Sequence, residues 1–162
     1  MKTKFKHIYL FLLFTTFWNF AAQDVKKNIY VIPIQDTIDL GIPSFVKRGI
    51  DLAESNNGDL IIFDIDTFGG RVDAATQIKD AISATDIPTL AFINRRAISA
   101  GSLISLSCDQ IFMTEGATIG ATSVVDMSGS KQSEKSQSYM REEMAATAEK
   151  ALILLEEWSM KS

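Results

Sequence analysis

The chain alternates short apolar runs with longer segments of helical periodicity, and this alternation constrains the fold more than any other feature. Three apolar runs of strand length occupy 28–34, 60–65 and 89–93, and the segments between them, 42–54 and 72–83, repeat apolar residues at helical spacing. Each intervening segment is long enough for a crossover between parallel strands. The run 60–65 is almost wholly apolar, which is typical of a strand covered on both faces. We therefore predict an α/β fold with a largely parallel sheet flanked by helices.

The remainder of the chain adds elements that are shorter or more polar. A short helix of small and apolar residues is predicted over 99–107, followed by a strand over 110–113 and a glycine-containing turn over 115–120. Residues 126–134 are rich in serine, glycine and charge, and they are expected to form an exposed loop. Beyond this loop, apolar residues recur at threes and fours over 139–158, which predicts a long amphipathic helix.

The first residues have the pattern of a secretory signal peptide. Three lysines precede an apolar run over 8–20, and small residues follow that run. The run is shorter than the roughly 20 residues that a membrane-spanning helix needs. We therefore expect a leader over residues 1–22 and an exported mature domain over 23–162. Because the chain ends directly after the last predicted helix, we expect this domain to be truncated at its C-terminus.

Two residue types are scarce enough to exclude whole classes of mechanism. Cys108 is the single cysteine, which excludes an internal disulfide and a cysteine-based zinc site. The only histidine, His7, lies in the predicted leader, so a mature catalytic site would work without imidazole. Without residues 1–22, the 16 basic residues fall to 13 against 20 acidic ones, a net charge of about −7. This charge argues against a nucleic-acid partner, and we expect neither a metal ion nor a cofactor.

Unusual residues follow two of the predicted strands, and binding sites in α/β sheets form at the carboxyl ends of strands. The first group is Asp66-Thr67-Phe68-Gly69-Gly70, whose paired glycines permit a tight turn and let a ligand approach backbone N–H groups. The second group is Ala97–Ser102, in which Ser99 lies where the chain turns from a strand into a helix. Taken alone, the first group is more typical of a plain turn, and a serine at a helix start is usually an N-cap.

Three motifs, in order and at family spacing, resemble those of the NfeD-type membrane serine peptidases, relatives of ClpP and of signal peptide peptidase A. The motifs are Asp-Thr-Phe-Gly-Gly at 66–70, Ile-Ser-Ala-Gly at 98–101 and Gly-Ala-Thr-Ile-Gly-Ala at 116–121. The resemblance extends over 28–150. It implies a ClpP/crotonase-like fold of repeated β-β-α and βαβ units.

The resemblance also implies roles for individual residues. It makes Ser99 the nucleophile and Lys135, which opens the last helix, its base; Lys131 in the preceding loop is a rival base. Without histidine, a serine hydroxyl still needs a base, and a lysine can serve when apolar surroundings disfavour its ammonium form. Backbone N–H groups of Gly70 and Ala100 could bind the oxyanion. The residues expected to contact a substrate are Phe68, Gly69, Ile98, Gly101 and Ser123.

The implied activity is that of a serine endopeptidase that cleaves apolar peptide segments of membrane-associated proteins, such as a stomatin-like protein. The implied assembly is a homo-oligomer, and the implied location is the periplasmic or extracytoplasmic face of a membrane. Phe68 departs from a proline that is common in the family, and Ile98 departs from a common alanine. Two alternatives remain open: an inactive, truncated domain that acts as a binding or assembly module, and an acyl-CoA hydratase-like protein, because crotonases share the fold and the backbone oxyanion hole.

Overall fold

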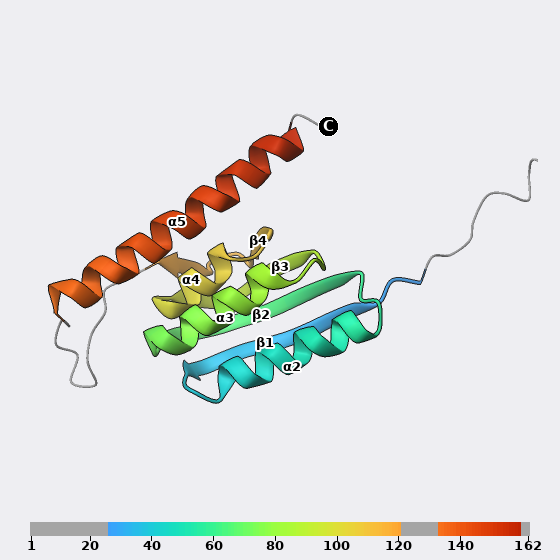
Figure 1. Ribbon diagram of the computed structural model, residues 1–162, viewed down its shortest axis with the longest axis horizontal. Coiled ribbons are helices and arrows are strands. Elements are labelled where there is room, and N and C mark those ends of the chain that lie inside the picture. Colours follow the sequence, from blue (N-terminus) through green and yellow to red (C-terminus); the bar gives the residue numbers. More distant parts are fainter. Residues whose placement is uncertain (1–25, 121–132, 160–162) are drawn as a thin grey trace, which may run out of the picture.

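The computed structural model describes residues 26–120 and 133–159, which form alternating strands and helices (Figure 1). Their order confirms the α/β interpretation of the sequence. The elements are β1 (Ile29–Ile38), α2 (Ile42–Ser55), β2 (Leu60–Gly70), α3 (Val72–Ala84), β3 (Thr89–Ile98), α4 (Ala100–Leu106), β4 (Gln110–Met113), β5 (Thr118–Gly120) and α5 (Glu134–Ser159).

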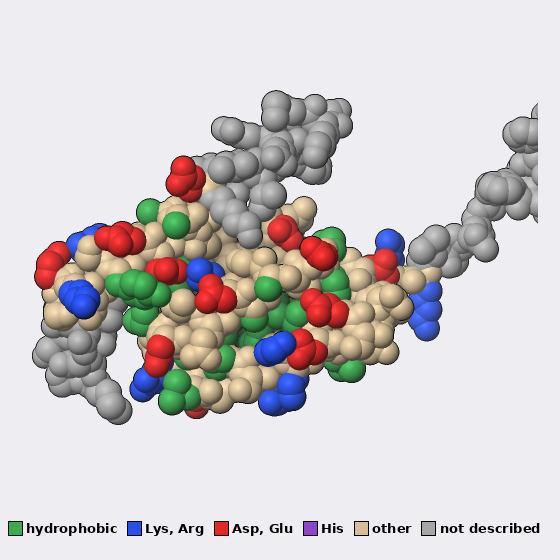
Figure 2. All heavy atoms as spheres, viewed as in Figure 1, with side chains coloured by type: hydrophobic (Ala, Val, Ile, Leu, Met, Phe, Trp, Pro, Cys, Tyr) green, Lys and Arg blue, Asp and Glu red, His purple; other side chains and the backbone are tan. Residues whose placement is uncertain are grey.

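The strands form one sheet in the order β1-β2-β3-β4, and β5 also pairs with β3. Each of these pairs is parallel, as the long crossovers predicted. Helices α2, α3 and α4 lie over the same face of the sheet (Figure 1). On the face shown in Figure 2, acidic and basic side chains are interspersed over the helices, as expected for helices whose apolar stripes face the sheet.

The core lies between the helices and the sheet. Fully buried side chains include Phe63 and Ile65 of β2, Ile93 of β3, Val46 of α2 and Ile78 of α3. Burial alternates along β2, so that every second residue from Ile61 onward is buried while those between are half-buried or exposed. Within 60–65 the residues between the buried ones are half-buried, so the strand face that points away from the described helices is only partly shielded.

The strands are longer than the apolar runs that predicted them. Pairing between β1 and β2 continues to Thr37–Gly69 and Ile38–Gly70, after a register shift between Gln35 and Thr37. The plain turn that was one interpretation of residues 66–70 is thus wrong, because these residues still belong to β2. Part of the predicted glycine turn is also a strand, since Thr118–Gly120 pairs with the end of β3.

The long C-terminal helix is confirmed, and α5 begins at Glu134 and ends at Ser159. Met140 is fully buried, and Met144 packs partly buried against the core. Residues 126–132 of the predicted loop lie outside the described residues, as does the predicted leader. None of the described helices combines the length and the apolar character that crossing a bilayer requires.

Candidate active site

Ser99 lies between β3 and α4 in a backbone conformation that residues other than glycine rarely adopt. Its φ is 55° and its ψ is −112°, and such a conformation typically stores about 1–3 kcal/mol of strain. The Ser99 N–H donates to the carbonyl oxygen of Gly120 at 2.8 Å. The Ser99 hydroxyl makes no capping hydrogen bond with α4. Ser99 therefore occupies the N-cap position without capping the helix, and its half-buried hydroxyl is left available.

Neighbouring small residues hold the chain in this sharp turn. The hydroxyl of buried Ser102 donates to the carbonyl oxygen of Ala97 at 2.7 Å and accepts from the N–H of Gly120 at 2.9 Å. A Cβ atom at Gly101 would stand only 2.6 Å from Cγ2 of Thr67, so glycine lets α4 start directly against β2. Ser102 thus has a structural role, and predicted Gly101 is buried beneath the site.

Gly69 of β2 brings the backbone of the neighbouring strand close to this turn. Its φ is +104°, and a Cβ atom there would stand 2.8 Å from the carbonyl oxygen of Ile98 and 2.9 Å from Cβ of Ser99. Buried Thr67 fixes this approach, because its hydroxyl accepts from the Gly69 N–H at 2.9 Å and donates to the carbonyl oxygen of Asp36. The sequence analysis gave Thr67 no role, although its position inside the glycine motif was a signal.

Two backbone N–H groups were predicted to bind an oxyanion. Ala100 lies in the first turn of α4, where N–H groups have no acceptor within the helix, and no other described residue accepts from it. The Gly69 N–H is already engaged by Thr67. Gly70 pairs with Ile38, and a Cβ atom at Gly70 would stand 2.2 Å from the Ile38 carbonyl oxygen. The role of Gly70 as the second donor stays a prediction.

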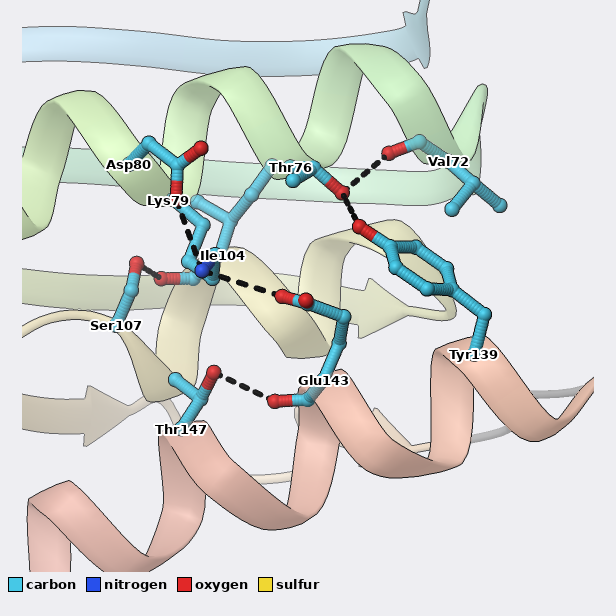
Figure 3. Close-up of polar contacts among 9 residues, drawn as sticks. All are labelled: Val72, Thr76, Lys79, Asp80, Ile104, Ser107, Tyr139, Glu143 and Thr147. Atoms are coloured by element: carbon cyan, nitrogen blue, oxygen red, sulfur yellow. Dashed lines mark hydrogen bonds and ion pairs between the residues drawn. The ribbon is translucent and has the colours of Figure 1, made fainter.

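Helix α5 docks so that its first turns lie near the start of α3 (Figure 3). The hydroxyl groups of Tyr139 and Thr76 are 3.4 Å apart, and one turn further along Glu143 Oε2 lies 3.1 Å from Lys79 Nζ. The ion pair with Asp80 and the pair with Glu143 both raise the pKa of Lys79, the contact with Asp80 having the larger effect. Because α3 starts directly after β2, these contacts place the beginning of α5 toward the carboxyl edge of the sheet.

Lys135 lies one helical turn before Tyr139 and therefore belongs to this edge. Its side chain is exposed, and it makes no hydrogen bond or ion pair with another described residue. The structure thus brings Ser99 and Gly69 together, whereas it does not join Lys135 to Ser99 by a hydrogen bond. The rival base Lys131 and the predicted substrate contact Ser123 lie outside the described residues.

A hollow of about 430 Å³ opens at the strand ends, and its lining includes Ile98, the residue before Ser99, but not Ser99 itself. Its lining includes Phe68 and Ile98, both predicted to contact substrate. It also includes Arg96, whose guanidinium carbon lies 4.3 Å from the centre of the Phe68 ring. The sequence analysis missed Arg96, although two consecutive arginines at the end of an apolar run were a visible signal.

Cys108 does not belong to the site. The thiol is buried and lies 3.6 Å from the carbonyl oxygen of Ile104. Burial is the main cause that raises the pKa of Cys108 far above its usual range, and the charge of Asp109 adds to it. Cys108 is therefore a small, unreactive residue of the core.

Known proteins resemble the chain both in sequence and in structure. Membrane protein NfeD1b of Bacillus subtilis is 38% identical over 141 residues, which cover 87% of this chain and 32% of that protein. Membrane-bound protease PH1510 of Pyrococcus horikoshii is 36% identical over 105 residues, which cover 62% of this chain and 24% of that protein. The chain thus spans about a third or less of the length of these relatives.

Among solved structures, the 1510-N membrane-bound stomatin-specific protease is similar in two variants. A lysine-to-alanine mutant in complex with a substrate peptide has a TM-score of 0.72 at 28% identity, covering 80% of this chain and 65% of that one. A serine-to-alanine mutant has a TM-score of 0.70 at 28% identity, covering 80% and 69%. ClpP1 from Listeria monocytogenes has a TM-score of 0.59 at 23% identity, covering 75% and 71%, which shows a shared fold.

The family described as the NfeD1b N-terminal domain matches residues 28–152, most of the chain. This match agrees with the motifs at Gly69 and Ser99 and with the ClpP-like fold of the sheet. The chain belongs to the family of NfeD1b N-terminal domains.

Proposed function

We propose that this chain is the catalytic domain of a serine endopeptidase, with Ser99 as nucleophile and Lys135 as its base. The observation that carries the proposal is the conformation of Ser99, which is held at a φ of 55° and a ψ of −112° at the head of α4. Strain of this kind persists only where surrounding contacts impose it, and it is concentrated at functional sites. A nucleophilic serine on a sharp strand-to-helix turn is one such case.

The geometry suits attack on a peptide carbonyl. Ser99 Oγ would add to the carbonyl carbon as Lys135 Nζ takes the hydroxyl proton, which forms a tetrahedral intermediate with a negative oxygen. The N–H groups of Ala100 and Gly70 would donate to this oxygen, and each such donor is typically worth about 3 kcal/mol of barrier. Collapse of the intermediate would pass the proton from Lys135 to the leaving amine, and water would then release the acyl group from Ser99.

The lysine has to reach the serine for this chemistry. Lys135 lies in the first turn of α5 at the carboxyl edge of the sheet, on a helix that Tyr139 and Glu143 fix to α3. Catalytic hydrogen bonds are often long before substrate binds and tighten in the complex.

We further propose that the substrate is an apolar segment of a membrane-associated protein, such as a stomatin-like protein. The support is that one similar protease is stomatin-specific and was solved with a substrate peptide. We also propose that the chain is exported through its leader over residues 1–22, acts at the extracytoplasmic face of a membrane, and self-associates. The named relatives are membrane proteins, which supports this location.

The test is labelling and cleavage by the mature chain. A serine-reactive phosphonate should modify Ser99, and apolar peptides should be cut. Ser99→Ala should abolish both, whereas Ser83→Ala, at an exposed serine of α3, should change neither. Lys135→Ala should reduce cleavage by at least about a hundredfold, while Lys131→Ala should leave it unchanged. Equal activity of parent and Ser99→Ala would refute the mechanism, and a chain that binds peptides without labelling or cleavage would instead be a binding module.

A further inference from the structure

A large aromatic side chain is left in water beside the candidate nucleophile. Phe68 is 72% exposed, and it directly precedes Gly69, whose backbone touches the Ser99 turn. Exposed aromatic side chains that border a site commonly contact a ligand. The inference developed from Phe68 rests on the proposed peptidase function.

The ring of Phe68 is held in place by two charged residues on the same face of the sheet. Thr67 pairs with Ala97, so Phe68 and Arg96 project from neighbouring strands on the same side. The guanidinium carbon of Arg96 lies 4.3 Å from the ring centre, within the range of a cation–π contact. Asp66 holds the arginine in turn, with 3.3 Å between its Oδ1 and Arg96 Nε. The ring is therefore anchored on its arginine side, while most of its surface remains open.

The hollow beside this ring is large enough to accept an aromatic side chain of a peptide. Its volume is about 430 Å³, and its apolar lining comes from Phe68, Ile98 and Ala117. Ile98 immediately precedes Ser99, so a peptide bound for attack at Ser99 would pass this hollow. Polar and charged side chains also contribute to the lining, those of Asn94, Arg95, Arg96, Glu115 and Thr118.

We propose that Arg96, held by Asp66, is a positioning residue that fixes Phe68 as the wall of a subsite for an aromatic side chain of the peptide substrate. An aromatic group can stack offset on the open part of the Phe68 ring, which a small side chain cannot do. The arginine acts through the ring: it keeps the wall in one orientation before substrate arrives, so less side-chain freedom is lost on binding.

The test compares two peptides that differ only by Phe or Ala at one position, with that position moved stepwise along both sides of the scissile bond. The readout is the ratio of kcat/KM values for the two peptides, from which losses in folding or active fraction cancel. The parent should prefer the Phe peptide by about tenfold or more at one position. Phe68→Ala should lower this ratio to about twofold or less, and Phe68→Leu should give an intermediate value.

Variants of Arg96 test whether this residue positions the Phe68 ring or only stabilises the fold. Arg96→Gln should lower the Phe/Ala ratio about two- to fivefold, and Arg96→Lys should restore part of it because an ammonium group also attracts a ring face. Asp66→Asn should act in the same direction as Arg96→Gln. The matched control is Arg48→Gln, at an exposed arginine of α2, which should leave the ratio unchanged.

A binding assay separates this inference from the proposed function. In a Ser99→Ala background, fluorescence anisotropy should give a lower Kd for the Phe peptide, and adding Phe68→Ala should remove that preference. If the chain neither cleaves peptides nor reacts with the phosphonate, but binds the Phe peptide more tightly only when Phe68 is present, the subsite would be supported and the peptidase function rejected. The subsite would be refuted if Phe68→Ala left the Phe/Ala ratio of kcat/KM unchanged. It would also be refuted if neither the cleavage assay nor the binding assay showed a preference for the Phe peptide.

Discussion

Replacing Gly69 by alanine forces a methyl group into the contact between β2 and the Ser99 turn. The new Cβ atom would stand 2.8 Å from the carbonyl oxygen of Ile98, 2.9 Å from Cβ of Ser99 and 3.2 Å from the backbone nitrogen of Ala100. None of these atoms is the free end of a flexible side chain, so relief requires a backbone shift. The φ of +104° adds strain of its own.

The expected loss of stability in Gly69→Ala is the sum of backbone strain and overpacking. Backbone strain at such a φ amounts to about 1–3 kcal/mol, and overpacking of a tight contact adds about 1–3 kcal/mol. Gly116 provides a matched control, because its φ is +79° but no described residue lies within 4 Å of a Cβ atom placed there. Gly116→Ala should therefore lower the free energy of unfolding by about 1 kcal/mol through strain alone, whereas Gly69→Ala should lower it by about 3 kcal/mol.

Thermal and urea denaturation of both variants measure the difference. A gap of about 2 kcal/mol corresponds to roughly 4–8 °C in Tm for a chain of this size. If Ser99 is the proposed nucleophile, its phosphonate labelling should also slow in Gly69→Ala, since the methyl group displaces the Ser99 turn, and should not slow in Gly116→Ala. If the free energies of unfolding of the two variants differ by less than about 0.5 kcal/mol, the close contact between Gly69 and the Ser99 turn would be refuted.

Two further predictions concern α5 and the core. A double-mutant cycle with Lys79→Met and Glu143→Gln should give a coupling of about 0.5–1 kcal/mol, because both side chains are mostly shielded from solvent and are therefore screened little by salt; the exposed Lys47–Asp51 pair on α2 should give less, and equal couplings would contradict this. Because burial raises the pKa of Cys108, iodoacetamide at pH 8 should modify it far more slowly in the native chain than in urea, and equal rates would show that the thiol is accessible.

Hydrophobic periodicity predicted every long element because these elements bury one apolar face against the others. It underestimated the length of the strands, which continue beyond the main core. Residues 35–38, 66–70 and 94–98 are rich in polar side chains and glycine, yet their backbones continue to pair after the register shifts in β1 and β2. Backbone pairing does not depend on apolar side chains, so a pattern of apolar residues cannot report where it ends.

The site was predictable in its parts but not in its conformation. The motifs at Gly69 and Ser99 follow neighbouring parallel strands, and this placed them at one edge of the sheet. The turn at Ser99 depends on hydrogen bonds of Ser102, within α4, and of Gly120, which belongs to a separate strand that the pattern around Ser99 does not reveal. The anchoring of Phe68 by Arg96 likewise arises from side chains on two strands.

The order of the strands has a consequence for how the chain assembles. Because β1, β2, β3 and β4 lie side by side in the order of their synthesis, each strand can join an existing edge as it leaves the ribosome, with no need to insert between partners already paired. The hydrogen bond from the Ser99 N–H cannot form until β5 has added, since the oxygen that accepts it belongs to Gly120. A nascent chain that stops before this residue should thus be folded in its first strands and still chemically silent.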